Sequence, residues 1–151
     1  MKKQKGFSLI ELLIVVAIIL IIAAIAIPNL LRSRIAANEA SAVGSIRTIN
    51  TAEVTFASTY PDVGFAALAS LGGSGGTSTG AGLLDSVLAG GTKSGYSFTT
   101  TITGGTPATQ YTVQGDPLSA QTGQRHFFSD QSGVIRYNTS AQATVSDNPL
   151  Q

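Results

Sequence analysis

Glu11 is the residue whose type and position in this chain most strongly suggest chemistry. It lies inside an apolar stretch from Phe7 to Ile27, in which Ser8 is the only other polar residue. A carboxylate inside a stretch long enough to cross a bilayer costs about 2.5–3.5 kcal/mol on insertion scales, and less near an interface. Because such a residue usually has a function and a partner, Glu11 is a candidate for ion pairing in apolar surroundings.

The stretch from Phe7 to Ile27 is long enough to cross a membrane. As a helix of roughly 21 residues it would be about 31 Å long, which is close to the thickness of bilayer hydrocarbon. The positive-inside rule places its start on the cytoplasmic side because three lysines precede it: Lys2, Lys3 and Lys5. The remainder of the chain is then expected to lie outside that membrane.

Two ordinary interpretations of this stretch are open. A secretory signal peptide would be cut after Ala26, because Ala24-Ile25-Ala26 is a small-x-small pattern. The apolar run is longer than a usual signal core, however, and it contains Glu11. An uncleaved membrane anchor is the second interpretation, and it leaves both Gly6 and Glu11 unexplained.

A third interpretation comes from a resemblance to a known family. The segment Lys5-Gly6-Phe7-Ser8-Leu9-Ile10-Glu11-Leu12 resembles the cleavage and methylation signal of type IV prepilins and related pseudopilins. The resemblance implies that a prepilin peptidase cuts between Gly6 and Phe7 and removes a basic leader, residues 1–6. It also implies that Phe7 becomes the new N-terminus and is N-methylated. Gly6 suits this cleavage because it has no Cβ, so its backbone can extend into a protease cleft.

The resemblance also gives Glu11 a role in assembly. After cleavage, its carboxylate is expected to pair with the methylated amine of Phe7 on a neighbouring subunit. In an apolar filament core such a pair fixes the register of the subunits, since a misplaced subunit leaves a buried charge unpaired. The alternative is that Glu11 only reaches out to the membrane interface.

Pro28 interrupts the helical pattern. It has no N–H for the carbonyl of Ala24 and clashes there, so the sequence predicts a helix kink or a local loosening at this residue. Pilins have a proline at this position of the mature chain, so the resemblance agrees. The alternative is a plain helix break between the anchor and the domain that follows.

Periodicity divides the chain up to residue 94. Residues 7–29 are expected to form an apolar transmembrane and filament-core helix, and residues 30–58 to continue it as the amphipathic helix of a head domain. The apolar stripe of this second part recurs at spacings of three, four and seven: Ile35, Ala42, Ile46, Ile49, Glu53 and Phe56. Tyr60-Pro61 ends the pattern, because the residue before a proline avoids the helical region. Residues 59–94 are predicted to be a connecting loop region with two short helical turns and a mobile Gly-rich segment from Gly72 to Gly82.

Residues 95–151 are predicted to form an antiparallel sheet and C-terminal loops. Apolar and polar residues alternate from Tyr96 to Ile102 and again from Gln110 to Gln114. Asp130-Gln131-Ser132-Gly133 is a hairpin turn signal between two further strands. A long N-terminal helix packed on such a roughly four-stranded antiparallel sheet is an α+β fold, and it resembles the pilin head.

Charge and composition exclude several functions. The formal net charge of +1 falls to −2 without the three leader lysines, since six basic side chains then face eight acidic ones. No polybasic patch follows residue 5, so nucleic-acid binding is not indicated. The chain has no cysteine and therefore no disulfide or thiolate chemistry. Many pilins carry a C-terminal disulfide, so the C-terminal loops of this chain must be held by hydrogen bonds and packing instead.

The sequence predicts no catalytic residue, no metal site and no cofactor. His126 is the only histidine, and we interpret it as a structural or surface residue because it alternates with Phe128 in a predicted strand. The glycines from Gly72 to Gly76 are not followed by Gly-Lys-Ser/Thr, so they make no phosphate loop. Calcium-loop spacing is missing from three scattered aspartates: Asp116, Asp130 and Asp147. The chain is accordingly predicted not to be an enzyme.

These features together predict a structural subunit. The resemblance implies a type IV pilin that inserts in a bacterial inner membrane as a precursor and then polymerises with copies of itself into a cell-surface filament. Its implied partners are a prepilin peptidase, an assembly platform in the membrane and cytoplasmic ATPases. The alternative is a pseudopilin of a type II secretion system, although the calcium ligands of its major subunit are not evident here. A secreted binding protein or enzyme released after Ala26 is a third alternative, and no site for it is visible.

Overall fold

The computed structural model describes residues 6–150. The predicted leader lies outside the described residues up to residue 5, and Gln151 lies outside them as well. The chain forms two compact units, of which the first ends at Arg34 and the second begins at Ile35.

One long helix, α1 (Leu9–Thr59), contributes to both units. Its bounds lie within two residues of the predicted ones at either end. The helix starts after Ser8, whose side chain and backbone serve as its N-terminal cap. It ends just before Tyr60-Pro61, where proline restricts the preceding residue to extended conformations.

The first unit consists of the apolar half of α1. Every large apolar side chain in it is exposed, from 43% for Leu31 to 82% for Phe7. By length and composition this half of the helix is apolar enough to cross a membrane. A helix that is apolar all round must be covered by lipid or by other protein chains.

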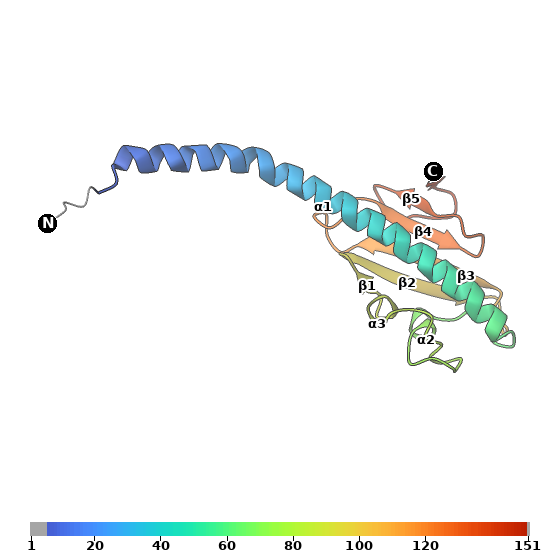
Figure 1. Ribbon diagram of the computed structural model, residues 1–151. Coiled ribbons are helices and arrows are strands. Elements are labelled where there is room, and N and C mark those ends of the chain that lie inside the picture. The colour runs from blue at the N-terminus through green and yellow to red at the C-terminus, as the bar shows by residue number, and fades with distance from the viewer. Residues whose placement is uncertain (1–5, 151) are drawn as a thin grey trace. The chain divides into compact units, whose positions relative to one another are not determined.

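The second unit contains a six-stranded antiparallel sheet with the simple order β1-β2-β3-β4-β5-β6 (Figure 1). The strands are β1 (Thr92–Lys93), β2 (Tyr96–Thr103), β3 (Gln110–Pro117), β4 (His126–Asp130), β5 (Arg136–Asn138) and β6 (Asn148–Pro149). The predicted α+β fold is confirmed, and the four predicted strands correspond to β2–β5. The sheet has two strands more than predicted because β1 and β6 are two residues long, which is too short for an alternating pattern.

The amphipathic half of α1 packs on one face of this sheet (Figure 1). Five of the six residues of the predicted stripe are buried, and Ile35 is half-buried at its start. The helix contributes Ile46, Ile49 and Phe56 to the core, each with no exposed surface. The sheet contributes buried side chains to the same cluster: Tyr96, Tyr111, Val113 and Phe127.

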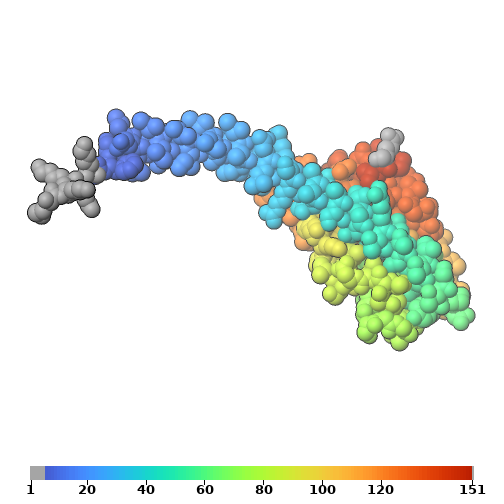
Figure 2. Space-filling model, viewed as in Figure 1, coloured from blue at the N-terminus to red at the C-terminus, as the bar shows by residue number. Residues whose placement is uncertain are grey.

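Between α1 and the sheet the chain forms two short helical turns, α2 (Leu68–Leu71) and α3 (Ser86–Ala89). Asp85 caps α3 by accepting hydrogen bonds from Val87 N–H and Leu88 N–H. The Gly-rich segment from Gly72 to Gly82 lies at the surface of this unit (Figure 2, yellow-green). Backbone hydrogen bonds tie both of its ends together, including Gly82 N–H to Gly72 O at 2.8 Å. The mobility of this segment stays a prediction.

Candidate functional site

The bond between Gly6 and Phe7 lies outside the helix. Gly6, Phe7 and Ser8 have no regular secondary structure and are exposed. A Cβ built on Gly6 would meet no atom within 4 Å among the described residues. The segment from Gly6 to Ser8 is therefore exposed and precedes α1, so a protein that binds it need not unwind the helix.

Glu11 folds back onto the start of its own helix. Its Oε2 accepts a hydrogen bond from Ser8 N–H at 2.8 Å, and Ser8 Oγ accepts a longer one from Ile10 N–H at 3.4 Å. This arrangement resembles a capping box: the carboxylate of the third helical residue accepts the N–H of the N-cap residue, while the N-cap hydroxyl accepts the N–H of the second helical residue, Ile10. Ser8 was not among the predicted site residues. The Ser-x-x-Glu spacing at the head of an apolar run is the sequence signal that identifies it.

The carboxylate of Glu11 is the only charged group among the exposed apolar side chains of the first unit between Phe7 and Leu31. Three of the predicted site residues, Gly6, Phe7 and Glu11, therefore lie close together in the sequence at the start of α1. Phe7 is fully outside the helix, and Glu11 lies in its first turn.

Pro28, the fourth predicted site residue, lies inside α1 and apart from this group. The helix is assigned without interruption on both sides of it. Because proline has no N–H, Pro28 cannot donate the hydrogen bond that the Ala24 carbonyl would accept in a regular helix. The kink at Pro28 stays a prediction.

In the second unit, a partly buried ion pair joins α1 to the segment just before β4. Arg125 Nε lies 2.7 Å from Glu39 Oε2, and Glu39 Oε1 accepts the backbone N–H groups of Gln124 and Arg125. Burial opposes ionisation of Glu39, but these hydrogen bonds and the Arg125 charge outweigh it and hold the pKa of Glu39 below its ordinary value. Glu39 is thus a charged, fully bonded acid that fixes the segment before β4 against the helix.

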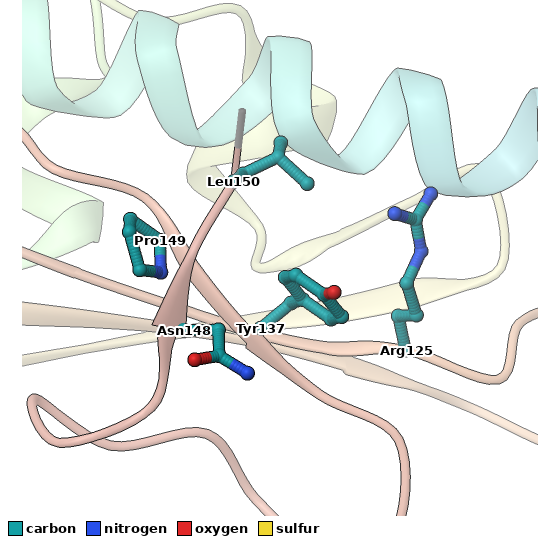
Figure 3. Close-up of a pocket in the computed structure, with 5 residues that line it drawn as sticks. All are labelled: Arg125, Tyr137, Asn148, Pro149 and Leu150. Carbon is teal, nitrogen blue, oxygen red and sulfur yellow. The ribbon is translucent and has the colours of Figure 1, made fainter.

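The cavity beside Arg125 has a volume of about 410 Å³ and is lined by Arg125, Tyr137, Asn148, Pro149 and Leu150. In Figure 3 the ring of Tyr137 lies between Leu150 and Arg125. The guanidinium carbon of Arg125 is 5.6 Å from the centre of that ring, a cation–π distance. Among the described residues that line the cavity, Arg125 is the one charged group, and it is already paired with Glu39.

His126 pairs with Asp116 instead of facing a nucleophile. Its Nδ1 lies 2.6 Å from Asp116 Oδ1, and Asp116 Oδ2 accepts a hydrogen bond from Gln142. This contact ties the ends of β3 and β4 to the C-terminal loop. Among residues 6–150, no group of three or more His, Asp or Glu side chains is placed to hold a metal ion.

Comparison with known proteins finds relatives for part of the chain. Residues 1–27 match the family described as the prokaryotic N-terminal methylation motif. The chain is 64% identical over 39 residues to the type IV wide pilus major component PilA4 of Thermus thermophilus, a match covering 26% of this chain and 30% of the relative. It is 44% identical over 54 residues to the type IV major pilin protein PilA of Myxococcus xanthus, covering 36% of this chain and 24% of the relative.

The matched regions span less than a third of the length of either relative. No solved structure gives a significant match to the chain. The predicted resemblance is confirmed: the chain carries the prokaryotic N-terminal methylation motif, and part of the chain is similar to part of two type IV pilins.

Proposed function

We propose that this protein is the structural subunit of a type IV pilus. The observation that carries the proposal is a helix with two unlike halves. One half is apolar on every side and exposed, with a single acid in its first turn, and the other half is packed on a sheet. In a soluble enzyme or binding protein, water would surround this apolar half. In a subunit that moves from a membrane into a filament, lipid and then other copies of the helix would cover it.

The processing step follows from the start of α1. We propose that a prepilin peptidase cuts between Gly6 and Phe7, and that the amine of Phe7 is then methylated. The exposed, non-helical segment before Leu9 supports this assignment, because the scissile bond is reachable while α1 stays intact. The methylation motif over residues 1–27 supports it independently.

Assembly would transfer the apolar half of α1 from lipid into a core made of the same half from other copies. Lipid tails are as apolar as these side chains, so the transfer gains little from the hydrophobic effect, and packing and polar contacts decide it. Glu11 supplies the polar contact by pairing with the Phe7 amine of a neighbouring copy. An unpaired charge in such a core is strongly destabilising, so the pair selects the correct register.

The remaining partners follow from this function. The precursor would lie in the bacterial inner membrane, with its leader on the cytoplasmic side and the sheet-bearing unit outside. Polymerisation requires an assembly platform in the membrane and cytoplasmic ATPases. The finished homopolymer would be an extracellular filament with the sheet units on its surface.

The proposal is tested on filaments sheared from the native cell surface. We expect mass spectrometry to identify this chain as a filament subunit, with Phe7 as its first residue and one added methyl group on the amine. A chain that begins at Ile27 would indicate secretion and contradict the proposal. A processed chain that begins at Phe7 but stays in the cell envelope would indicate the pseudopilin alternative.

A further inference from the structure

The two carboxylate oxygens of Glu11 have different surroundings within the chain. Oε2 is bonded to Ser8 N–H at 2.8 Å, a short distance typical of a charge-assisted hydrogen bond. Among the described residues, no hydrogen bond or ion pair involves Oε1. Within the described residues, one oxygen is therefore held by the chain itself and the other makes no such contact.

Ser8 is fixed in the position that makes this bond. Its carbonyl accepts the N–H of Leu12 at 3.3 Å, and its Oγ accepts the N–H of Ile10 at 3.4 Å. Together these contacts keep Ser8 at the N-cap, with its own N–H directed at the third helical residue. The side chain of Ser8 thus acts on Glu11 through the conformation of the helix start.

Holding one oxygen in advance favours pairing by the other. A long acidic side chain loses much rotamer freedom when it is fixed, and a contact made beforehand removes that cost from the later binding step. The backbone N–H also stabilises the carboxylate while it lies in apolar surroundings without a cationic partner. Both effects act before a second copy arrives.

We infer that Ser8 is a positioning residue of the assembly contact, which holds Glu11 Oε2 on its own chain and leaves Oε1 for the Phe7 amine of a neighbouring copy. This inference rests on the proposed function, because it refines how Glu11 pairs. It differs from that proposal in giving Ser8, which is not itself charged, an effect on assembly that acts only through Glu11.

The test is a double-mutant cycle in native cells that also express the wild-type chain. The readout is the incorporation ratio, defined as the amount of a variant in sheared filaments divided by its processed amount in the membrane. We expect Ser8→Ala to lower this ratio about fivefold, the effect of a typical lost N-cap. Ser8→Thr keeps a capping hydroxyl, so its ratio should be close to that of the wild-type chain. Ser33→Ala is the matched control, because Ser33 lies exposed in the same helix and its side chain makes no hydrogen bond within the described residues.

The cycle is completed in a Glu11→Ala background. If Ser8 acts through Glu11, Ser8→Ala has no further effect there, since interacting residues are non-additive. An equal fold-loss in both backgrounds would overturn the inference, and so would a Ser8→Ala ratio equal to wild type. A wild-type ratio for Glu11→Ala alone would instead overturn the pairing in the proposed function, so the two failures are distinguishable.

A second measurement does not depend on filaments. In the full processed chain, isotopically labelled and held in detergent micelles at one fixed pH, the Ser8 amide proton should exchange with solvent faster in Glu11→Ala than in the wild-type chain, because its acceptor is lost. The Ser33 amide is the internal control and should exchange equally in both proteins. A Ser8 amide that exchanges at the same rate in both would show that the own-chain bond does not exist and would overturn the inference.

Discussion

Glu53 on α1 accepts a hydrogen bond from Ala66 N–H, with 3.0 Å between Oε2 and the nitrogen, in a part of the core that water does not reach. The side chain has no exposed surface, and its Oε1 has no hydrogen-bond partner in the described part of the chain. Burial outweighs the single hydrogen bond and raises the pKa of Glu53 to about 7. The bond fastens the chain just after α1 to the helix, next to the bridge between Gly64 and Ala108.

This raised pKa predicts that the second unit loses stability as the pH rises from about 4.5 to about 7. The unfolded chain releases the Glu53 proton near pH 4.5, whereas the folded chain keeps it until near pH 7. This contribution of Glu53 to the unfolding free energy is therefore fully present below the unfolded pKa and is lost as pH rises through the folded pKa, with an amplitude on the order of 3 kcal/mol. Urea unfolding of a fragment that begins at Arg32, measured from pH 4 to pH 8, checks it.

The control for this pH dependence is Glu53→Gln. Its amide oxygen can still accept the Ala66 N–H, and its side chain does not titrate. We expect the difference in unfolding free energy between the two proteins to change across the same pH window and to be flat outside it. A difference that is constant over the whole range would show that Glu53 has an ordinary pKa in the folded unit.

Periodicity predicted the fold where it extends over many residues. The stripe from Ile35 to Phe56 has the helical spacing, and four strands have recognisable alternation or a turn signal between them. The pattern also placed Glu53 on the buried face, although an acid at that position contradicts simple hydrophobic patterning. Two-residue strands such as β6 give no periodic signal, because they exist only as partners of a longer neighbouring strand.

The family signal proposes Gly6, Phe7 and Glu11 as site residues, and their roles stay predictions. The bond from Ser8 N–H to Glu11 was not predicted, because the resemblance assigns Glu11 a charged partner on another chain, whereas the partner in the structure is a backbone N–H of its own chain. The contacts of Glu39 with Arg125 and of Asn50 with Ser129 join residues 86 and 79 positions apart. No local pattern encodes such pairs, since they arise only when the helix and the sheet have packed.

The second unit is expected to fold without the first. A fragment beginning at Arg32 omits the exposed apolar half of α1 and retains the buried cluster intact. It should be a soluble monomer with mixed helix and strand content by circular dichroism and a cooperative thermal transition. A chain with the spectrum of an unfolded protein would show that the apolar half of α1 is needed for folding.

Two glycines in this fragment should respond to alanine in opposite directions. A Cβ on Gly123 would clash with the hydroxyl oxygen of Tyr96, which is buried and donates to the Arg125 carbonyl. Gly123→Ala is therefore expected to destabilise the fragment by about 1–3 kcal/mol. A Cβ on Gly44 meets no atom within 4 Å on the exposed side of α1, so Gly44→Ala should stabilise it by about 0.5–1 kcal/mol. Unfolding free energies of both variants check this, and equal effects would contradict the packing around Tyr96.

Cleavage should depend on the size of residue 6. Gly6→Val adds a β-branched side chain at the scissile bond, which restricts the backbone and occupies space that a protease needs. We expect full-length precursor to accumulate in the membrane, detected by intact mass. Gly44→Ala is a suitable control, since it changes a glycine within α1, far from this bond. Wild-type processing of Gly6→Val would exclude cleavage between Gly6 and Phe7.

Glu11 gives the most direct test of assembly, because two substitutions separate its charge from its cap. Glu11→Ala removes both, and it should still insert in the membrane, since a costly polar group is lost. It should also be cleaved after Gly6, because the scissile bond is unchanged. The yield of sheared filaments should nevertheless fall at least about tenfold, the effect of losing roughly 1.4 kcal/mol per contact, because each Phe7 amine in the apolar core would lack its partner.

Glu11→Gln keeps an oxygen for the Ser8 N–H but carries no charge, so its yield should fall less than that of Glu11→Ala and remain below wild type. Precursor, processed chain and filament are quantified in the same cells. Filaments from Glu11→Ala at wild-type yield would mean that the carboxylate serves only as a helix cap.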